Sequence, residues 1–131
     1  MGNRNRIVDA LSGLLQRHNV DAFVIFEEKG SGKYVQFAGS ANEGLLLDLP
    51  SQTLTEEEAK RAEVLFSELG TPGPETYEMY TDKSRKTAAG MQTSFQIDFA
   101  RDVVRAAMVT LAIFERVYRF PPDFHLVLTE N

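Results

Sequence analysis

Cysteine is absent from this 131-residue chain, and histidine occurs only twice. The missing cysteine excludes disulfides, thiolate nucleophiles and zinc fingers. The two histidines, His18 and His125, lie far apart in the sequence, and neither has a second histidine or carboxylate at ligand spacing nearby. Because a lone histidine is far more often structural than a ligand, we predict no metal site.

Long apolar runs and a targeting segment are also lacking. The longest apolar helical segment, residues 103–117, is interrupted by Arg105, Thr110 and Glu115 and is too short to span a bilayer. The first residues, MGNRNRIVDALSGLLQRHN, contain neither the unbroken apolar core nor the cleavage pattern of a secretory signal. We therefore expect a cytoplasmic protein with no membrane partner, and the absence of cysteine fits that reducing compartment.

Basic residues are outnumbered, since the net charge is −5 and the isoelectric point is near 5.0. A nucleic-acid partner would need a strongly local basic patch. The only candidate cluster is Lys83, Arg85 and Lys86 in TDKSRKTAAG. Such a trio is typical of a solvated loop, because duplex binding usually draws on many phosphate contacts. We predict no nucleic-acid partner.

What the chain does contain is a regular series of short elements. A helix is predicted over residues 4–18, and three apolar runs separated by glycine turns follow it: AFVIFEE, KYVQFAG and GLLLDLP. Thr55 and Glu58 form a T-x-x-E capping box that opens a second helix, and Gly70 ends that helix. Strands over 75–81 and 93–99, a helix over 101–118 and a strand over 124–129 complete the chain. The prediction is one α+β domain, residues 1–131, in the order α-βββ-α-ββ-α-β, with an antiparallel sheet whose helices pack mainly on one face.

Side-chain alternation predicts which residues face the core. In LLLDLP, Leu47 shares the inner face with Leu45 and Leu49, whereas Leu46 shares the outer face with Asp48. Residues 22–27 are apolar on both faces, which is typical of a strand covered on both sides or placed in an interface. The buried stripe of the last helix is predicted to contain Val104, Ala107, Met108, Leu111, Phe114, Val117 and Tyr118.

No constellation for catalysis is present. GSGK at residues 30–33 leads into a strand and lacks the spacing of a phosphate-binding loop, so it is interpreted as a hairpin turn. The acidic run 56–58 is explained by the first turn of a helix, where negative charge is favourable. Asp48 and Asp98 each lie on the polar face of a strand, and nothing in the sequence pairs them. We predict a protein that is not an enzyme and holds no cofactor.

Two surfaces are candidates for binding a protein partner. The segment 75–81 is polar enough for an edge strand and carries Tyr77, Met79 and Tyr80, which could recruit a peptide by strand addition. The alternative is that Tyr77 and Met79 cover the core and Tyr80 simply lies over the surface. The second candidate is the apolar face near Phe23 and Ile25.

The sequence pattern FVIFEE…KYVQFAG…LLLDLP…LTEEEAKRAEVLFSELG resembles the type III secretion chaperone-like superfamily, in particular its TY-Chap or YbjN-like branch. The resemblance covers roughly residues 20–118. It implies a small, acidic, homodimeric bacterial protein of the cytosol with an αβββαββα layout that binds extended segments of client proteins without hydrolysing them. The predicted strand 124–129 departs from that layout, and no set of binding residues carries over.

Two hypotheses about function follow. The first is a dimeric, chaperone-like module that binds another protein or a peptide segment. The second is a small-ligand-binding or sensory regulatory domain with a pocket between sheet and helices. A flat apolar sheet face or a long groove would favour the first, and a deep apolar cavity with converging polar groups would favour the second.

Overall fold

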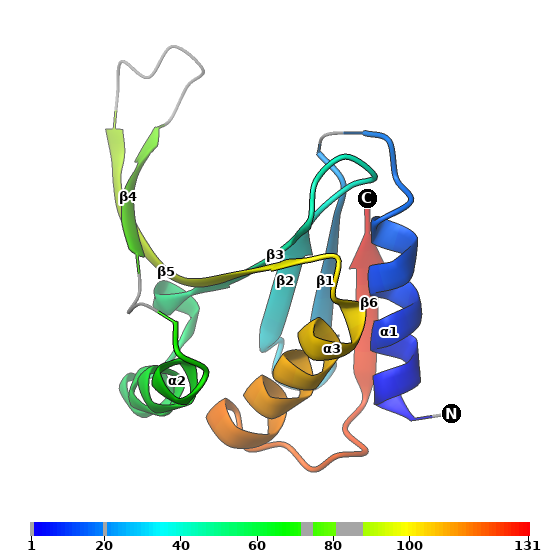
Figure 1. Ribbon diagram of the computed structural model, residues 1–131. Helices are drawn as coiled ribbons and strands as arrows, with labels where there is room; N and C mark the ends of the chain where they lie inside the picture. The colour runs from blue at the N-terminus through cyan, green and yellow to red at the C-terminus, as the bar shows by residue number, and fades with distance from the viewer. Residues whose placement is uncertain (1, 20, 72–74, 81–87) are drawn as a thin grey trace.

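The computed structural model describes residues 2–19, 21–71, 75–80 and 88–131, with side chains described for 2–19, 21–71 and 94–131. Within these ranges the chain forms an α+β fold (Figure 1). Its elements are α1 (Asn3–Leu14), β1 (Phe23–Glu28), β2 (Tyr34–Ala38), β3 (Leu45–Pro50), the 3₁₀ turn η1 (Ser51–Thr53), α2 (Glu56–Glu68), β4 (Glu75–Tyr80), β5 (Ala88–Ala100), α3 (Val103–Ala112), its π-helical continuation η2 (Ile113–Val117) and β6 (Leu126–Glu130). The predicted order α-βββ-α-ββ-α-β is confirmed.

The six strands form one antiparallel sheet in the order β4-β5-β3-β2-β1-β6. Strand β5 is longer than predicted because it has two partners: residues 88–94 pair with β4, and 94–100 pair with β3. The added C-terminal strand β6 pairs with β1 and covers its edge. Asn3 and Arg6 of α1 donate to the carbonyls of Phe124 and Leu126, both at 2.8 Å, which fixes α1 beside β6 (Figure 1).

The core lies between one face of the sheet and the helices. Leu47 is fully buried, with its neighbours on the same face, whereas Leu46 is 38% exposed, so the predicted alternation of β3 is confirmed. The rings of Phe26 and Phe37 meet edge to face with their centroids 6.1 Å apart. The other buried apolar strand residues of this face are Val24, Val35, Leu45, Leu49, Phe95, Ile97, Phe99 and Leu126.

The last helix differs from its predicted stripe. Val104 and Met108 were expected in the core, but they are 52% and 57% exposed, and Ala106, Val109 and Ile113 are buried instead. Residues 103–114 are apolar at almost every position, so periodicity alone does not define which side faces the sheet. Helix α1 is also shorter than predicted, because it ends at Leu14, one residue after the helix-weakening Gly13.

The GSGK segment is a hairpin turn, as predicted, with Gly32 in the left-handed region at φ 74°. The lysine has a role that the sequence did not indicate. Its Nζ lies 2.9 Å from Oε1 of Glu58, the glutamate of the capping box that opens α2, and Thr55 N donates to the same oxygen at 2.8 Å. Lys33 therefore ties the β1–β2 hairpin to the start of α2.

The Lys33–Glu58 pair predicts a pH-dependent stability difference. Burial acts to raise the pKa of Glu58, but hydrogen bonds from Lys33 and Thr55 outweigh it and hold that pKa below its usual value of 4.5. The stabilisation is present above the usual pKa and is lost as the pH falls through the lowered one. Lys33→Met should cost about 1–2 kcal/mol at pH 7 and less at pH 3. Urea unfolding at both pH values measures this, with the exposed Lys29→Met as control, and an equal cost at both would contradict the assignment.

Candidate functional site

The face of the sheet opposite the core carries a shallow hollow of about 200 Å³. Its lining residues come from four neighbouring strands, mostly at the positions that alternate with the core: Phe23 and Ile25 of β1, Gln36 and Ala38 of β2, Leu46 and Asp48 of β3, and Gln96 of β5. Phe37 of β2, between Gln36 and Ala38, also contributes. α1 and α3 lie side by side on the core side of the sheet (Figure 1). Among the described residues, this second face therefore has no helical cover.

One polar group at the hollow is incompletely satisfied. Gln36 and Asp48 are cross-strand partners, and Nε2 of Gln36 donates to Oδ2 of Asp48 at 2.9 Å. The other carboxylate oxygen, Oδ1, is buried and has no hydrogen-bond partner in the part of the chain that the structure describes. Burial, and secondly the Asp48 charge, raise the pKa of the neighbouring Tyr34 hydroxyl. A buried carboxylate oxygen without a donor costs free energy, so Asp48 is a site where a donor from outside would be stabilising.

The apolar residues around Asp48 complete the site. Phe23 and Ile25 are half-buried and Leu46 is 38% exposed, although all three side chains point away from the core. A ligand group that lies here would contact apolar carbon on its sides and a carboxylate oxygen at one point. Such an arrangement would bind a ligand group by burying its apolar surface and by accepting one hydrogen bond from it.

The structure brings together only part of the predicted site. Phe23 and Ile25 line the hollow. Their strand was expected to be covered on both faces or to lie in an interface, and in the described residues helices cover one face only. Tyr77, Met79 and Tyr80 lie on β4, which is an edge strand as predicted, and β5, β3 and β2 separate it from β1. The side chains of these three residues fall outside the described part of the chain. The two predicted surfaces are therefore at different places on the sheet.

Asp48 and Gln36 were missed as a pair by sequence reasoning. Both are polar residues on the outer faces of consecutive strands, and only the β2–β3 register places them opposite each other.

In the described ranges, no three histidine or acidic side chains gather in a way that could hold a metal ion. No helix in those ranges is long and apolar enough to cross a membrane.

Comparison of the chain with protein-family models, with curated proteins and with solved structures finds no match.

Proposed function

We propose that the protein is a non-enzymatic, homodimeric protein-binding module that docks an extended segment of a partner protein on the open face of its sheet. The observation that carries the proposal is the buried Oδ1 of Asp48, which lacks a donor among the described residues and lies in an apolar frame. A backbone N–H or a cationic side chain of a partner would supply the donor. Interface hot spots combine a desolvated polar contact with surrounding apolar residues in this way.

The shape of the site favours a protein partner over a small ligand. The hollow of about 200 Å³ is smaller than the range of roughly 300–1,000 Å³ typical of ligand pockets. It lies on a sheet face rather than between the sheet and the helices, where the alternative sensory domain would need its pocket. Between sheet and helices, phenylalanine rings pack against one another, as Phe66 and Phe95 do at 5.0 Å. The resemblance to secretion chaperones supports the same choice.

The proposed homodimer has a separate apolar surface available. Met108 of α3 is 57% exposed, although it is a large apolar residue. It lines a hollow of about 270 Å³ between α2 and α3, together with Leu65 and Leu69. An exposed apolar side chain beside such a hollow is typical of a protein interface. We assign the contact with a second copy to this α2–α3 surface, which leaves the sheet face free.

Asp48→Ala tests the docking site. The variant removes a buried oxygen that has no donor among the described residues, but it also removes the hydrogen bond from Gln36. Because these two effects oppose each other, the thermal midpoint of the free protein should change little. Capture of the partner should nevertheless fall at least about tenfold, as for a hot-spot contact. The measurement is quantitative mass spectrometry of proteins captured from the native lysate by the wild type and by each variant, with melting followed by fluorimetry.

Asp9→Ala is the matched control, because Asp9 is an exposed aspartate on α1, on the helical side of the molecule. It should retain the same captured protein. The proposal would be overturned if Asp48→Ala captured that protein as well as the wild type did, or if both variants lost it equally. In the same samples, a sedimenting particle of 14.7 kDa instead of twice that mass would remove the homodimer from the proposal.

A further inference from the structure

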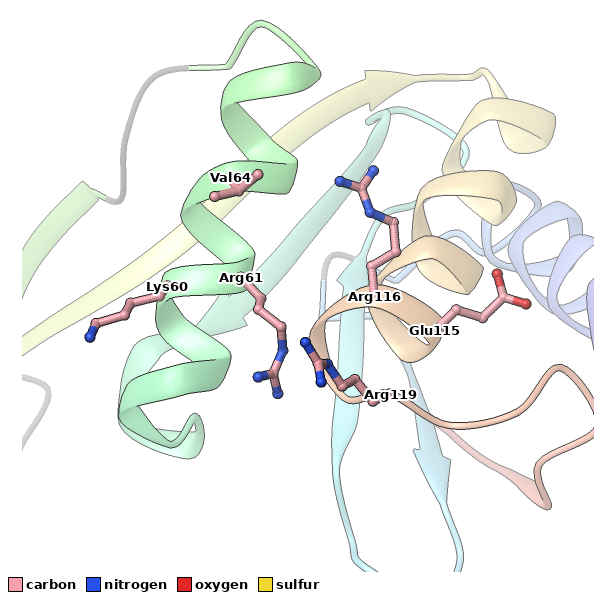
Figure 2. A pocket seen from close by; sticks show the side chains of 6 residues that line it. All are labelled: Lys60, Arg61, Val64, Glu115, Arg116 and Arg119. Carbon is pink, nitrogen blue, oxygen red and sulfur yellow. The ribbon is translucent and has the colours of Figure 1, made fainter.

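A third hollow, of about 450 Å³, lies between α2 and η2 and is lined mainly by cations. Its lining residues are Lys60, Arg61, Val64, Glu115, Arg116 and Arg119 (Figure 2). Four positive side chains and one negative one line this hollow, in a chain whose net charge is −5. Two of the four cations also have a carboxylate partner outside the lining, since Arg116 pairs with Glu68 and Arg61 with Glu57. A local excess of positive charge in an acidic protein attracts and concentrates anions.

The two arginines that face each other across the hollow are incompletely neutralised. Figure 2 shows the guanidinium groups of Arg61 and Arg119 pointing toward one another, whereas the Glu115 carboxylate points away from them. The side chains of Arg119 and Lys60 have no hydrogen-bond or ion-pair partner among the described residues. The nearest carboxylate to Arg61 is that of Glu57, at 3.7 Å, and it is 85% exposed, so solvent screens it. Glu57 is therefore a weak counterion, and the repulsion between the two facing guanidinium groups is only partly offset.

The structure fixes the direction of the Arg61 guanidinium and the main-chain conformation at Arg119. Nε of Arg61 donates to the Val117 carbonyl at 2.9 Å, which spans the hollow and fixes the direction of that guanidinium. Arg119 has φ 63°, the left-handed conformation, at the position after the helix end where glycine is usual. The Phe120 N–H closes this turn by donating to the Phe114 carbonyl at 2.9 Å. A non-glycine residue in this region is strained, and such strain is often associated with function.

We propose that this hollow is an anion site that binds the phosphate group of a small molecule. A phosphate dianion presents oxygens on all sides, so two guanidinium forks on opposite walls can each bind it bidentately. A single carboxylate would neutralise only one of the two. Val64 gives the hollow one apolar wall, against which the body of an organic phosphate would lie. The site is on the helical side of the molecule, away from the docking face, and it does not depend on the proposed function.

Calorimetric titration with pyrophosphate, inorganic phosphate and phenyl phosphate, in a low-salt buffer free of other phosphates, tests the site. The wild type should bind one anion per chain, and Arg119→Gly should weaken the binding at least about tenfold. Because glycine adopts the left-handed conformation without strain, Arg119→Gly should not lower the thermal midpoint. Arg4→Gln, which also removes one positive charge but lies on α1, is the control and should bind like the wild type.

Tighter binding of phenyl phosphate than of inorganic phosphate would support an organic phosphate as the source, and the reverse order would support the inorganic ion at the same site. The proposal is overturned if no anion gives a saturable signal, or if Arg119→Gly and Arg4→Gln weaken binding equally. It is also overturned if a hexaglutamate peptide binds more tightly than every phosphate, because the site would then recognise an acidic segment.

Discussion

Leu47→Asp should leave the chain unfolded at neutral pH, while Leu46→Asp, one position earlier, should still fold. Leu47 is fully buried at the centre of the sheet, where it pairs with Phe37 on β2 and Ile97 on β5. Loss of its apolar contacts costs about 2–5 kcal/mol. An unpaired buried charge adds several kcal/mol, so the sum reaches the roughly 5–15 kcal/mol that a whole domain has available.

Leu46 differs from Leu47 only in the side of the sheet that it faces. It is 38% exposed, so an aspartate there stays hydrated. Its cross-strand partner is Asp98, and Asp48 follows on the same face, so repulsion should cost about 1 kcal/mol, within the range for exposed charges. Circular dichroism and urea unfolding of the two variants measure the contrast. Equal stability of the two would mean that the register of β3 is not the one described.

The elements that were predictable from sequence are those whose signals are local. The capping box of α2 needs only Thr55 and Glu58, and both of its hydrogen bonds are present. The alternation in β3 needs only neighbours two residues apart. Helix α3 could not be oriented in the same way, because apolar residues surround its axis and the packed side is chosen by the sheet and by α1. The extent of β5 was underestimated because residues 88–92, AAGMQ, lack alternating apolar positions.

The candidate sites were predictable to different degrees. Phe23 and Ile25 could be identified because a strand that is apolar on both faces has more apolar surface than one core can cover. The Asp48 acceptor needed the β2–β3 register, which brings Gln36 to one of its oxygens and leaves the other without a donor among the described residues. The cationic hollow was hidden, because Arg61 and Arg119 lie far apart in the sequence and the net charge is negative. Long-range contacts alone create it.

Gly44→Ala should destabilise the protein by about 3 kcal/mol, the upper part of the range for overpacking, although it adds a single methyl group. A Cβ at Gly44 would lie 2.6 Å from Cα of Ala100 and 2.8 Å from its carbonyl oxygen. These are backbone atoms, so no side-chain rotation relieves the clash. Ala100 cannot move easily either: it ends β5 with φ 54°, and its N–H donates to Oδ1 of Asp98 at 2.8 Å.

The matched substitution Gly13→Ala should have the opposite effect. Gly13 lies in α1, and nothing is within 4 Å of the position that its Cβ would take. Alanine there should stabilise the helix by about 0.5–1 kcal/mol, because glycine loses more backbone entropy on folding. Urea unfolding of both variants at one temperature gives the two differences directly. If Gly44→Ala were neutral, the close approach of the β2–β3 turn to the end of β5 would be wrong, and with it the pairing of β3 and β5 that holds Leu46 and Asp48 on the open face.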